Sequence, residues 1–256
     1  MEKIALVTGA SRGIGRAVAA ELAHRGWAVA IGYRVRRDKA EELAAALTAE
    51  GCRAMICRAD VSRREEVEEM VRTVADTFGP ISLLVNNAGI AGQCLFQDLT
   101  DERWHEFFSV NVDGAFYTSR AVLPAMLHEH EGCIVNISSM NAFTPLTKIP
   151  AYSGAKAAVS NFTQWLAVHF ANCNIRVNAI APGFFATNQN RTLLFNEDGS
   201  LTPRSHKIIS QTPMGRFGEP EELLGTLRFL IDNDASGFVT GITIPVDGGF
   251  SAYSGV

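Results

Sequence analysis

A tyrosine and a lysine that could together transfer a proton lie four residues apart, at Tyr152 and Lys156. In a helix, residues at this spacing share one face, so the two side chains can meet. A free phenol titrates at about pH 10, which is too high for efficient proton exchange at neutral pH, and a neighbouring ammonium favours the phenolate. The pair predicts a general acid/base at Tyr152 with Lys156 lowering its pKa. A lone tyrosine is usually only a packed surface residue, so this prediction depends on the motifs that accompany it.

A second candidate site is a glycine-rich turn near the N-terminus. Residues Thr8 to Gly15 follow an apolar segment and lead into the helical pattern Arg16–His24. Glycines spaced in this way allow a tight turn and a close approach of the backbone to a pyrophosphate, and the helix N-terminus offers its free N–H groups to phosphate. The context predicts a dinucleotide site. The residues expected to contact the cofactor here are Gly9, Ser11, Arg12, Gly13, Ile14 and Gly15.

The end of the second expected strand predicts which dinucleotide is preferred. Folds that bind NAD commonly carry an acidic residue there, which accepts a hydrogen bond from the ribose 2′-OH. This chain has Tyr33 and Arg34 instead, followed by Arg36 and Arg37. A 2′-phosphate would meet Arg34 and Arg12 through charge-assisted hydrogen bonds, which favours NADP(H) over NAD(H). At least one of Arg36 and Arg37 is expected only to be solvated at a helix start.

Composition and charge exclude several classes of protein. The 256 residues are 47% hydrophobic and 20% charged, as in ordinary globular proteins, which argues against disorder, collagen and coiled coil. A net charge of −4 gives no support for broad binding to nucleic acid or an anionic membrane. No apolar run approaches the roughly 20 residues of a membrane span, and no signal-peptide pattern is present, so a cytoplasmic protein is expected. Five cysteines without metal-site spacing predict reduced thiols and no metal.

Short apolar runs that alternate with helical periods indicate how these residues are positioned. The expected strands are Ile4–Val7, Ala28–Tyr33, Ala54–Cys57, Ile81–Val85, Cys133–Ile137, Ile175–Ile180 and Ile242–Val246. Repeated strand–helix–strand units require parallel pairing. We therefore expect an α/β protein: a three-layer doubly wound Rossmann fold with a mainly seven-stranded parallel sheet, in a single domain over residues 1–256. Residues 184–213 are expected to leave the sheet and cover the substrate.

Two helix starts carry the sequence pattern of a capping box. Ser62 is followed by Glu65, and Asp38 is followed by Glu41. In such a box the first side chain accepts a hydrogen bond from the backbone three residues on, and the acidic side chain reaches back. We predict a helix start at each pair.

Further motifs appear in a fixed order after the glycine turn. They are Asn86-Asn87-Ala88-Gly89, Asn111, Ser139, the Tyr152/Lys156 pair, Pro182-Gly183 and Asp247-Gly248-Gly249. With Thr8 to Gly15 they run along the whole chain, and together the chain resembles the classical short-chain dehydrogenases/reductases. Each motif is short, but their order and register make the resemblance specific.

The resemblance implies a role for each catalytic candidate. Tyr152 would protonate the alkoxide that forms when a ketone receives hydride from nicotinamide C4, and Ser139 would donate a second hydrogen bond to that oxygen. In the family the serine lies thirteen residues before the tyrosine, which selects Ser139 over Ser138. Lys156 would also hold the nicotinamide ribose, and Asn111 would hold a water linking Lys156 to solvent.

The resemblance also implies the remaining cofactor contacts and the assembly. Asp60 and Val61 would meet the adenine, although Asp60 has an alternative role as a helix-capping acid. The other expected contacts are Asn87, Ala88, Gly89, Pro182, Gly183 and Thr187. A homotetramer is implied, and the aromatic residues at helical spacing in the expected subunit contact are Trp104, Phe107, Phe108 and Phe116.

The two halves of the chain resemble enzymes with different substrates. The segment 95–100 is similar to 3-oxoacyl-carrier-protein reductases, whereas segments 140–146, 194–199 and 245–256 are similar to short-chain enzymes of D-mannonate and fructuronate interconversion. Because the back half should cover the substrate, a sugar acid is preferred over a β-keto thioester. The side chains available for its hydroxyls and carboxylate are Asn141, Asn188, Gln189, Asn190 and Arg191. A non-catalytic dinucleotide-binding protein is the remaining alternative, and it is disfavoured because Tyr152 and Lys156 are both present.

Overall fold

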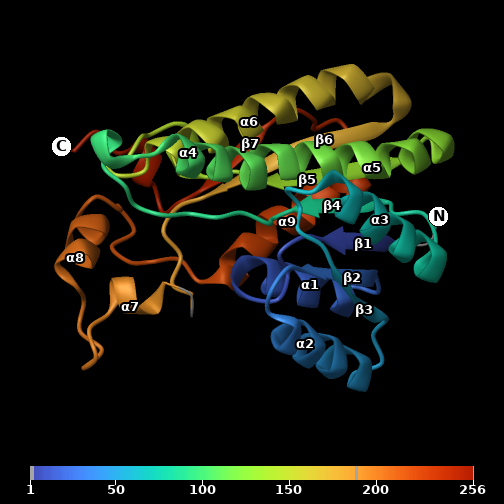
Figure 1. Cartoon of the computed structure of the whole chain (residues 1–256), viewed down its shortest axis with the longest axis horizontal. Coiled ribbons are helices and arrows are strands. Elements are labelled where there is room, and N and C mark those ends of the chain that lie inside the picture. Colours follow the sequence, from blue (N-terminus) through green and yellow to red (C-terminus); the bar gives the residue numbers. More distant parts are fainter. Residues whose placement is uncertain (1–2, 188–189, 256) are drawn as a thin grey trace.

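The computed structural model describes residues 3–187 and 190–255 and centres on a seven-stranded parallel sheet (Figure 1). The strands are β1 (Ile4–Val7), β2 (Ala28–Tyr33), β3 (Ala54–Arg58), β4 (Leu83–Asn86), β5 (Gly132–Ile137), β6 (Ile175–Pro182) and β7 (Thr243–Val246). The helices are α1 (Gly13–His24), α2 (Arg37–Ala49), α3 (Arg64–Phe78), α4 (Asp101–Phe108), α5 (Gly114–Glu129), α6 (Pro150–Phe170), α7 (Arg191–Leu194), α8 (Pro203–Ser210), α9 (Leu224–Ile231) and α10 (Asn233–Ser236). The expected doubly wound α/β fold is confirmed.

The strand order places a binding crevice in the middle of the sheet. The order is β3-β2-β1-β4-β5-β6-β7, so the chain winds outward from β1 in one direction and from β4 in the other. The pairing of β1 with β4, for example Leu6 with Leu84, is the point where this direction reverses. Ligands of open α/β sheets bind beyond the carboxyl ends of the strands at such a point.

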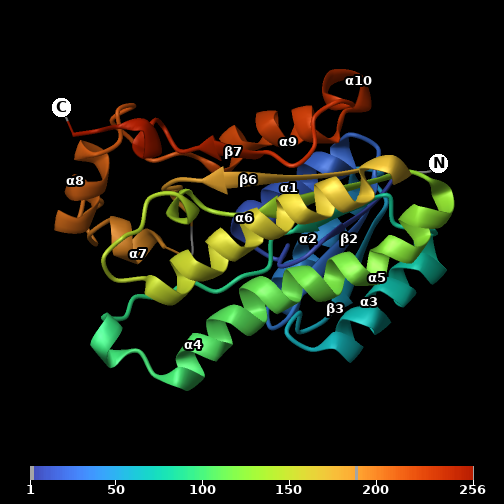
Figure 2. The ribbon, with the colours of Figure 1, turned by 90° about the horizontal axis from the view of Figure 1, so that it is seen from above.

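Alternating side chains of the strands form two hydrophobic layers. In β1, Ala5 and Val7 pack with α1, α2 and α9, whereas Ile4 and Leu6 pack with α3, α5 and α6. All four residues of this strand are buried, as expected for a central strand covered on both faces. Figure 2 shows α4 leading directly into α5, with α6 running along the same face of the sheet.

All seven expected strands are present, and their ends differ by a few residues. The strand β4 starts at Leu83 rather than Ile81, and β6 continues to Pro182. The two capping boxes are wrong. The helix α2 starts at Arg37, which places Asp38 inside the first turn, and α3 starts at Arg64 after an N-cap residue, Arg63, that has no side-chain cap.

Another acid occupies the place expected for the cap of α3. Asp60 Oδ1 accepts hydrogen bonds from the backbone nitrogen of Ser62 (3.0 Å) and from its hydroxyl (2.7 Å). Glu66, rather than Glu65, reaches back to the Asp60 backbone nitrogen, at 2.9 Å. The hydrogen-bonded turn before α3 is therefore built on Asp60, two residues before the predicted cap residue Ser62.

The segment expected to leave the sheet does so after β6. It carries α7 and α8, which lie apart from the sheet at the end of the molecule where the C-terminus is found (Figure 1). A small hydrophobic cluster of Leu194, Ile208 and Phe217 holds these helices together. No helix within the described residues has the length and apolar character needed to cross a bilayer.

Candidate active site

The end of β5 and the first turns of α6 bring the expected catalytic side chains together. Ser139 follows β5 directly, and Tyr152 and Lys156 lie one turn apart on α6. The Lys156 Nζ atom donates a hydrogen bond to the Ile137 carbonyl oxygen at 2.8 Å and lies 5.7 Å from the centre of the Tyr152 ring. Ser139 and Lys156 are each 5% exposed. The three side chains therefore share one water-poor corner of the crevice.

The two neighbouring serines have different partners. The Ser138 hydroxyl bonds to the Ser160 hydroxyl at 2.7 Å and to the Lys156 carbonyl oxygen at 3.2 Å, so it ties β5 to α6. The Ser139 hydroxyl instead faces the Tyr152 phenol. This placement agrees with the choice of Ser139 over Ser138.

Burial dominates the electrostatics of this corner. It raises the pKa of Tyr152, and the Ser139 hydroxyl offsets only part of that rise. The same loss of solvent lowers the pKa of Lys156 from 10.5 to about 8. Desolvation of the charged form is the largest influence on Tyr152 here, and the expected lowering of its pKa by Lys156 and the nicotinamide stays a prediction.

A break in the helix that runs from α4 to α5 positions Asn111. Residues Ser109–Asp113 form a π-helical turn, in which the Gly114 nitrogen bonds back to the Ser109 carbonyl oxygen. The Asn111 Nδ2 atom donates to the carbonyl oxygens of Ile90 (3.0 Å) and Phe107 (2.9 Å). Such turns are frequent at functional sites. They present a side chain that a regular helix would direct elsewhere.

The free end of the Asn111 amide faces Lys156. Its Oδ1 atom is buried and has no hydrogen-bond partner in the described part of the chain. A Cβ atom added at Gly89 would lie 2.6 Å from this oxygen and 3.6 Å from Lys156 Nζ, so only glycine fits there. A cavity of about 10 Å³, lined by both side chains, is close to the space that one water needs. The arrangement can hold a water between Asn111 and Lys156.

The glycine turn is held in shape by the segment after β4. The Asn87 Nδ2 atom donates to the carbonyl oxygens of Thr8 (2.9 Å) and Gly9 (3.0 Å). The Thr8 hydroxyl in return accepts from the backbone nitrogens of Asn87 (3.1 Å) and Ala88 (3.0 Å). A Cβ atom at Gly15 would lie 2.3 Å from Asn87 Nδ2, so this glycine is required for close packing.

The turn fits the pyrophosphate of a dinucleotide. Gly13 has a φ of +57°, and a Cβ atom added there would meet only the Thr187 methyl group, at 4.0 Å. The helix α1 begins here, and the side chain of its N-cap residue, Arg12, makes no cap hydrogen bond within the described residues. The adjoining cleft, of about 760 Å³, is lined by Ser11, Arg12 and Thr187 among others. Free N–H groups at an open helix N-terminus are suited to an anion.

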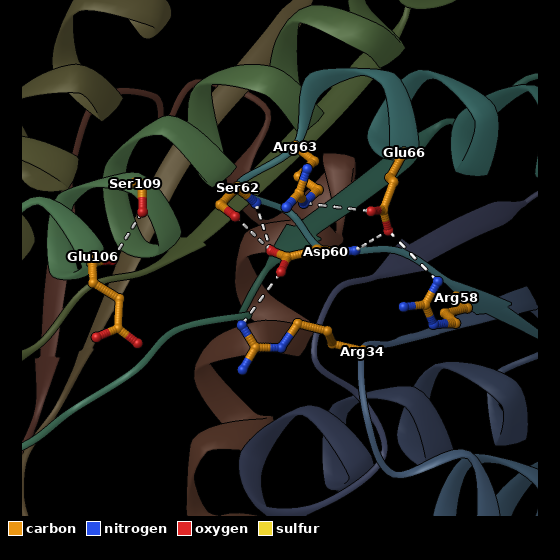
Figure 3. Close-up of polar contacts among 8 residues, drawn as sticks. All are labelled: Arg34, Arg58, Asp60, Ser62, Arg63, Glu66, Glu106 and Ser109. Atoms are coloured by element: carbon orange, nitrogen blue, oxygen red, sulfur yellow. Dashed lines mark hydrogen bonds and ion pairs between the residues drawn. The ribbon is translucent and has the colours of Figure 1, made fainter.

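Charged residues gather around Asp60, where the adenosine of the cofactor is expected (Figure 3). The Arg34 guanidinium lies 3.4 Å from Asp60 Oδ2, and 47% of the Arg34 side chain is exposed. Partial burial acts to raise the pKa of Asp60, but hydrogen bonds from Ser62 and the nearby Arg34 outweigh it, so the pKa is lowered. Arg12 is exposed and has no ion-pair partner within the described part of the chain. Two guanidinium groups are thus available to a phosphate.

Two of the expected adenosine contacts are mainly packing residues. Tyr33 is 6% exposed and lies in the cluster under α1 and α2, which leaves little of its side chain for a ligand. Val61 is 8% exposed and packs on Gly114, where an added Cβ atom would lie 2.8 Å from Val61 Cγ2. Asp60 organises the turn before α3 but is not the cap of that helix, whose N-cap residue is Arg63, and its adenine contact stays a prediction.

The end of β6 forms the opposite wall of the cleft. Pro182 closes the strand, and a Cβ atom at Gly183 would lie 2.6 Å from the Asp247 Cα atom, so the two chain segments touch. The Thr187 nitrogen and hydroxyl both donate to Asn190 Oδ1, at 2.8 and 3.2 Å. Asn190 therefore fixes Thr187 in place.

The expected substrate residues are only partly placed by the structure. Asn190 uses its Nδ2 atom on the Phe185 carbonyl oxygen, so both ends of its amide bond to protein. Arg191 lines the cleft and stacks over Phe195. Asn141 bonds to Ser139. Asn188 and Gln189 lie outside the described residues.

Two groups of the site were missed in the sequence. The Thr8 hydroxyl organises the glycine turn, and its position directly before Gly9 was the available signal. The Ile137 carbonyl oxygen holds Lys156, and no residue type could have indicated a backbone acceptor.

Comparison with known proteins agrees with this geometry. The family model described as short chain dehydrogenase matches residues 3–198. An uncharacterised oxidoreductase of Bacillus subtilis is 47% identical over 99% of this chain and 96% of its own length. A 3-oxoacyl-[acyl-carrier-protein] reductase of Synechocystis is 38% identical over 98% of both chains.

Two crystal structures resemble the fold closely. A protein provisionally assigned as a D-mannonate oxidoreductase, from Haemophilus influenzae and with bound NAD, has a TM-score of 0.94 at 43% identity and covers 100% of this chain and 98% of its own. A gluconate 5-dehydrogenase from Burkholderia cenocepacia, in complex with NADP and tartrate, has a TM-score of 0.90 at 34% identity, over 99% and 97%. Both nicotinamide dinucleotides therefore occur among similar proteins.

Proposed function

The chain belongs to the short-chain dehydrogenase family, and we propose that it interconverts a ketone and a secondary alcohol of a sugar acid by hydride transfer. One domain, residues 1–256, would carry both the cofactor and the substrate. The observation that carries the proposal is the convergence of buried Ser139 and Lys156 with half-buried Tyr152, where Lys156 and Thr8 of the glycine turn line one small cavity.

The catalytic residues would divide the work as follows. The bound nicotinamide supplies the hydride in reduction and accepts it in oxidation. Ser139 donates a hydrogen bond to the substrate oxygen, and Tyr152 gives its phenolic proton to the same oxygen as negative charge develops there. Lys156 holds the cofactor ribose and favours the tyrosinate that remains. Asn111 keeps a water next to Lys156, through which the proton is replaced from solvent.

NADP(H) is the preferred cofactor in this proposal. Arg34 and Arg12 are exposed near the expected ribose end, and a dianionic 2′-phosphate would bind both through charge-assisted hydrogen bonds. Asp60 is the nearest carboxylate to Arg34, and the 3.4 Å separation makes theirs a weak pair that a phosphate can displace. The protein from Haemophilus influenzae with NAD shows that the alternative has to be tested.

The sugar acid is supported by relatives and by one side chain. The similar structures include a protein provisionally assigned as a D-mannonate oxidoreductase and a gluconate 5-dehydrogenase. Arg191, which lines the cleft beside the glycine turn, is the cation predicted to bind the carboxylate. A β-keto thioester on an acyl carrier is the second candidate, favoured by the similarity to 3-oxoacyl-[acyl-carrier-protein] reductases. It would require a basic surface for the acidic carrier, and residues 101–131 contain only Arg103 and Arg120 as permanent cations.

The substrate is tested by following NADPH and NADH oxidation with fructuronate and, separately, with acetoacetyl thioester. Faster turnover of fructuronate, with NADPH preferred, supports the proposal. Turnover of the thioester alone would reject the sugar acid. Dinucleotide binding without turnover of any carbonyl compound would instead favour the non-catalytic alternative.

We also propose that the protein works in the cytoplasm as a homotetramer. Aromatic side chains on one side of the molecule support the assembly: Trp104 stacks on Phe108, and Phe116 is 40% exposed. Phe107 is buried and belongs to the core instead. Light scattering coupled to size-exclusion chromatography would measure the mass, and a monomer at micromolar concentration would contradict this assembly.

A further inference from the structure

The Ser139 hydroxyl oxygen accepts two hydrogen bonds from a single residue, Asn141. The Asn141 backbone nitrogen lies 3.2 Å from Ser139 Oγ, and its side-chain Nδ2 atom lies 3.1 Å from the same oxygen. The 3₁₀ turn Met140–Ala142, of which Ser139 is the N-cap residue, brings both donors to one side of the hydroxyl. The sequence alone indicated Asn141 only as a candidate for substrate binding.

A hydroxyl group has one hydrogen to donate and two lone pairs that accept. Both lone pairs of Ser139 are filled by Asn141, so the hydroxyl can only donate in any further hydrogen bond. We propose that Asn141 is a positioning residue that makes Ser139 an obligate donor toward the substrate oxygen and Tyr152. The inference rests on the proposed function, in which Ser139 donates to the reacting oxygen.

Whether Ser139 donates to or accepts from the phenol of Tyr152 also affects the pKa of that tyrosine. A Ser139 hydroxyl with a free lone pair could accept the phenolic hydrogen, which would stabilise the neutral tyrosine. With both lone pairs filled, Ser139 donates to the phenol oxygen and stabilises the tyrosinate. Burial is the largest influence on Tyr152 and raises its pKa, and Ser139 acts in the opposite direction.

This arrangement is unfavourable for the oxygen atom of the Asn141 side-chain amide. The Asn141 Oδ1 atom is buried and has no hydrogen-bond partner among residues 3–187 and 190–255. Turning the amide over would give the Ser139 hydrogen an acceptor, and Ser139 would then have no hydrogen left for the substrate. An uncompensated buried oxygen is unfavourable. Its presence beside a reacting group is explained if the nitrogen is needed on Ser139.

The test compares three substitutions at Asn141 and Ser139. In Asn141→Leu the side chain has similar size and no donor, and in Asn141→Asp it presents an acceptor to the Ser139 hydroxyl. We expect kcat for ketone reduction to fall about 10-fold in Asn141→Leu and about 100-fold in Asn141→Asp, the second being typical of a lost oxyanion donor. The KM of the substrate should change by less than about threefold, because Asn141 acts through Ser139.

The Ser139→Ala background separates positioning from substrate binding. If Asn141 acts through Ser139, adding Asn141→Leu to Ser139→Ala should change kcat by less than about twofold. Additive losses, or a large rise in KM with kcat preserved, would identify Asn141 as a substrate ligand and overturn the inference. Asn172→Leu, an exposed asparagine beside Cys173, is the matched control and should behave as wild type.

A second measurement needs no substrate. The titration of Tyr152 can be followed by tyrosinate absorbance, as the difference between each protein and its Tyr152→Phe counterpart. Asn141→Leu should raise the pKa of Tyr152, and the same substitution in Ser139→Ala should leave it unchanged. An unchanged Tyr152 pKa in Asn141→Leu refutes the inference, whichever substrate the enzyme uses. If the wild-type protein is inactive but the Tyr152 pKa still rises in Asn141→Leu, the result counts only against the proposed function.

Discussion

Replacement of Lys156 by methionine should stabilise the protein while it abolishes turnover. The ammonium is buried, and burial lowers its pKa from 10.5 to about 8. One pH unit corresponds to about 1.4 kcal/mol, so keeping this lysine protonated in the folded protein costs about 3 kcal/mol at neutral pH. Methionine has a similar length and no charge. The hydrogen bond from Lys156 to the Ile137 carbonyl oxygen is lost in the variant, which offsets about 1–2 kcal/mol of the gain in stability.

The stability that Lys156→Met gains over the wild type should decrease as the pH rises. The pKa of Lys156 is lower in the folded state than in the unfolded state, so between pH 8 and 10.5 the unfolded chain binds more protons. Stability of the wild type therefore rises with pH in this window, and below it both states are protonated and the full cost remains. The advantage of Lys156→Met should be largest below about pH 8 and should shrink by about 2 kcal/mol between about pH 7 and about pH 9.5.

Urea unfolding at these two pH values, at one protein concentration, measures the difference in the free energy of unfolding. Lys148→Met is a suitable control, because Lys148 is exposed and its replacement should give no pH-dependent difference. The reasoning is refuted if Lys156→Met is less stable than the wild type near neutral pH, or if the difference between them is the same at both pH values.

Three further predictions address the proton donor, the glycine turn and the cofactor. Tyr152→Phe should reduce kcat at least about 100-fold, because the proton donor is removed, with the Kd for NADPH measured by fluorescence nearly unchanged; undiminished activity would show that another group supplies the proton. Gly13→Ala and Gly26→Ala should each lose about 1–2 kcal/mol in urea unfolding, because both positions have positive φ and open space around an added Cβ atom. Only Gly13→Ala should also weaken dinucleotide binding, and equal affinities in the two variants would mean that the turn is not the pyrophosphate site. Arg34→Ala should lower kcat/KM for NADPH about 10–100-fold and leave that for NADH unchanged, as expected for the loss of a charge-assisted phosphate contact; a parallel loss with both cofactors would exclude a role in 2′-phosphate recognition.

Much of the fold could be predicted because its signals are local and periodic. The strands are short apolar runs, buried throughout except in the edge strands β3 and β7, and their alternation with helices leaves few topologies. The glycine turn was equally readable, because the positive φ at Gly13 and the tight packing at Gly15 both exclude other residues. The placement of Ser139 beside Tyr152 followed from the order of the motifs.

Competing contacts between near neighbours, together with burial, explain what could not be predicted. Ser62 and Asp38 have the spacing of helix caps, but Asp60 captures the Ser62 hydroxyl, and Arg36 binds the Asp38 carboxylate. The pKa of Tyr152 depends on how deeply the pair is buried, which the four-residue spacing to Lys156 does not contain. The amide of Asn141 is another example, because its partner is a neighbour in sequence that is recognised only from the shape of the turn.

The π-helical turn at Ser109–Asp113 joins two helices whose faces it keeps aligned. A π-helical turn holds about one residue more than an α-helical turn, so a single deletion inside it would leave a regular helix with α4 and α5 still in phase. The stacked Trp104 and Phe108 and the buried Val122 and Met126 would keep their neighbours, and only the side chains of the turn itself would be redirected. The packing of these helices therefore gives no reason to retain the extra residue, and the position that it gives to Asn111 does.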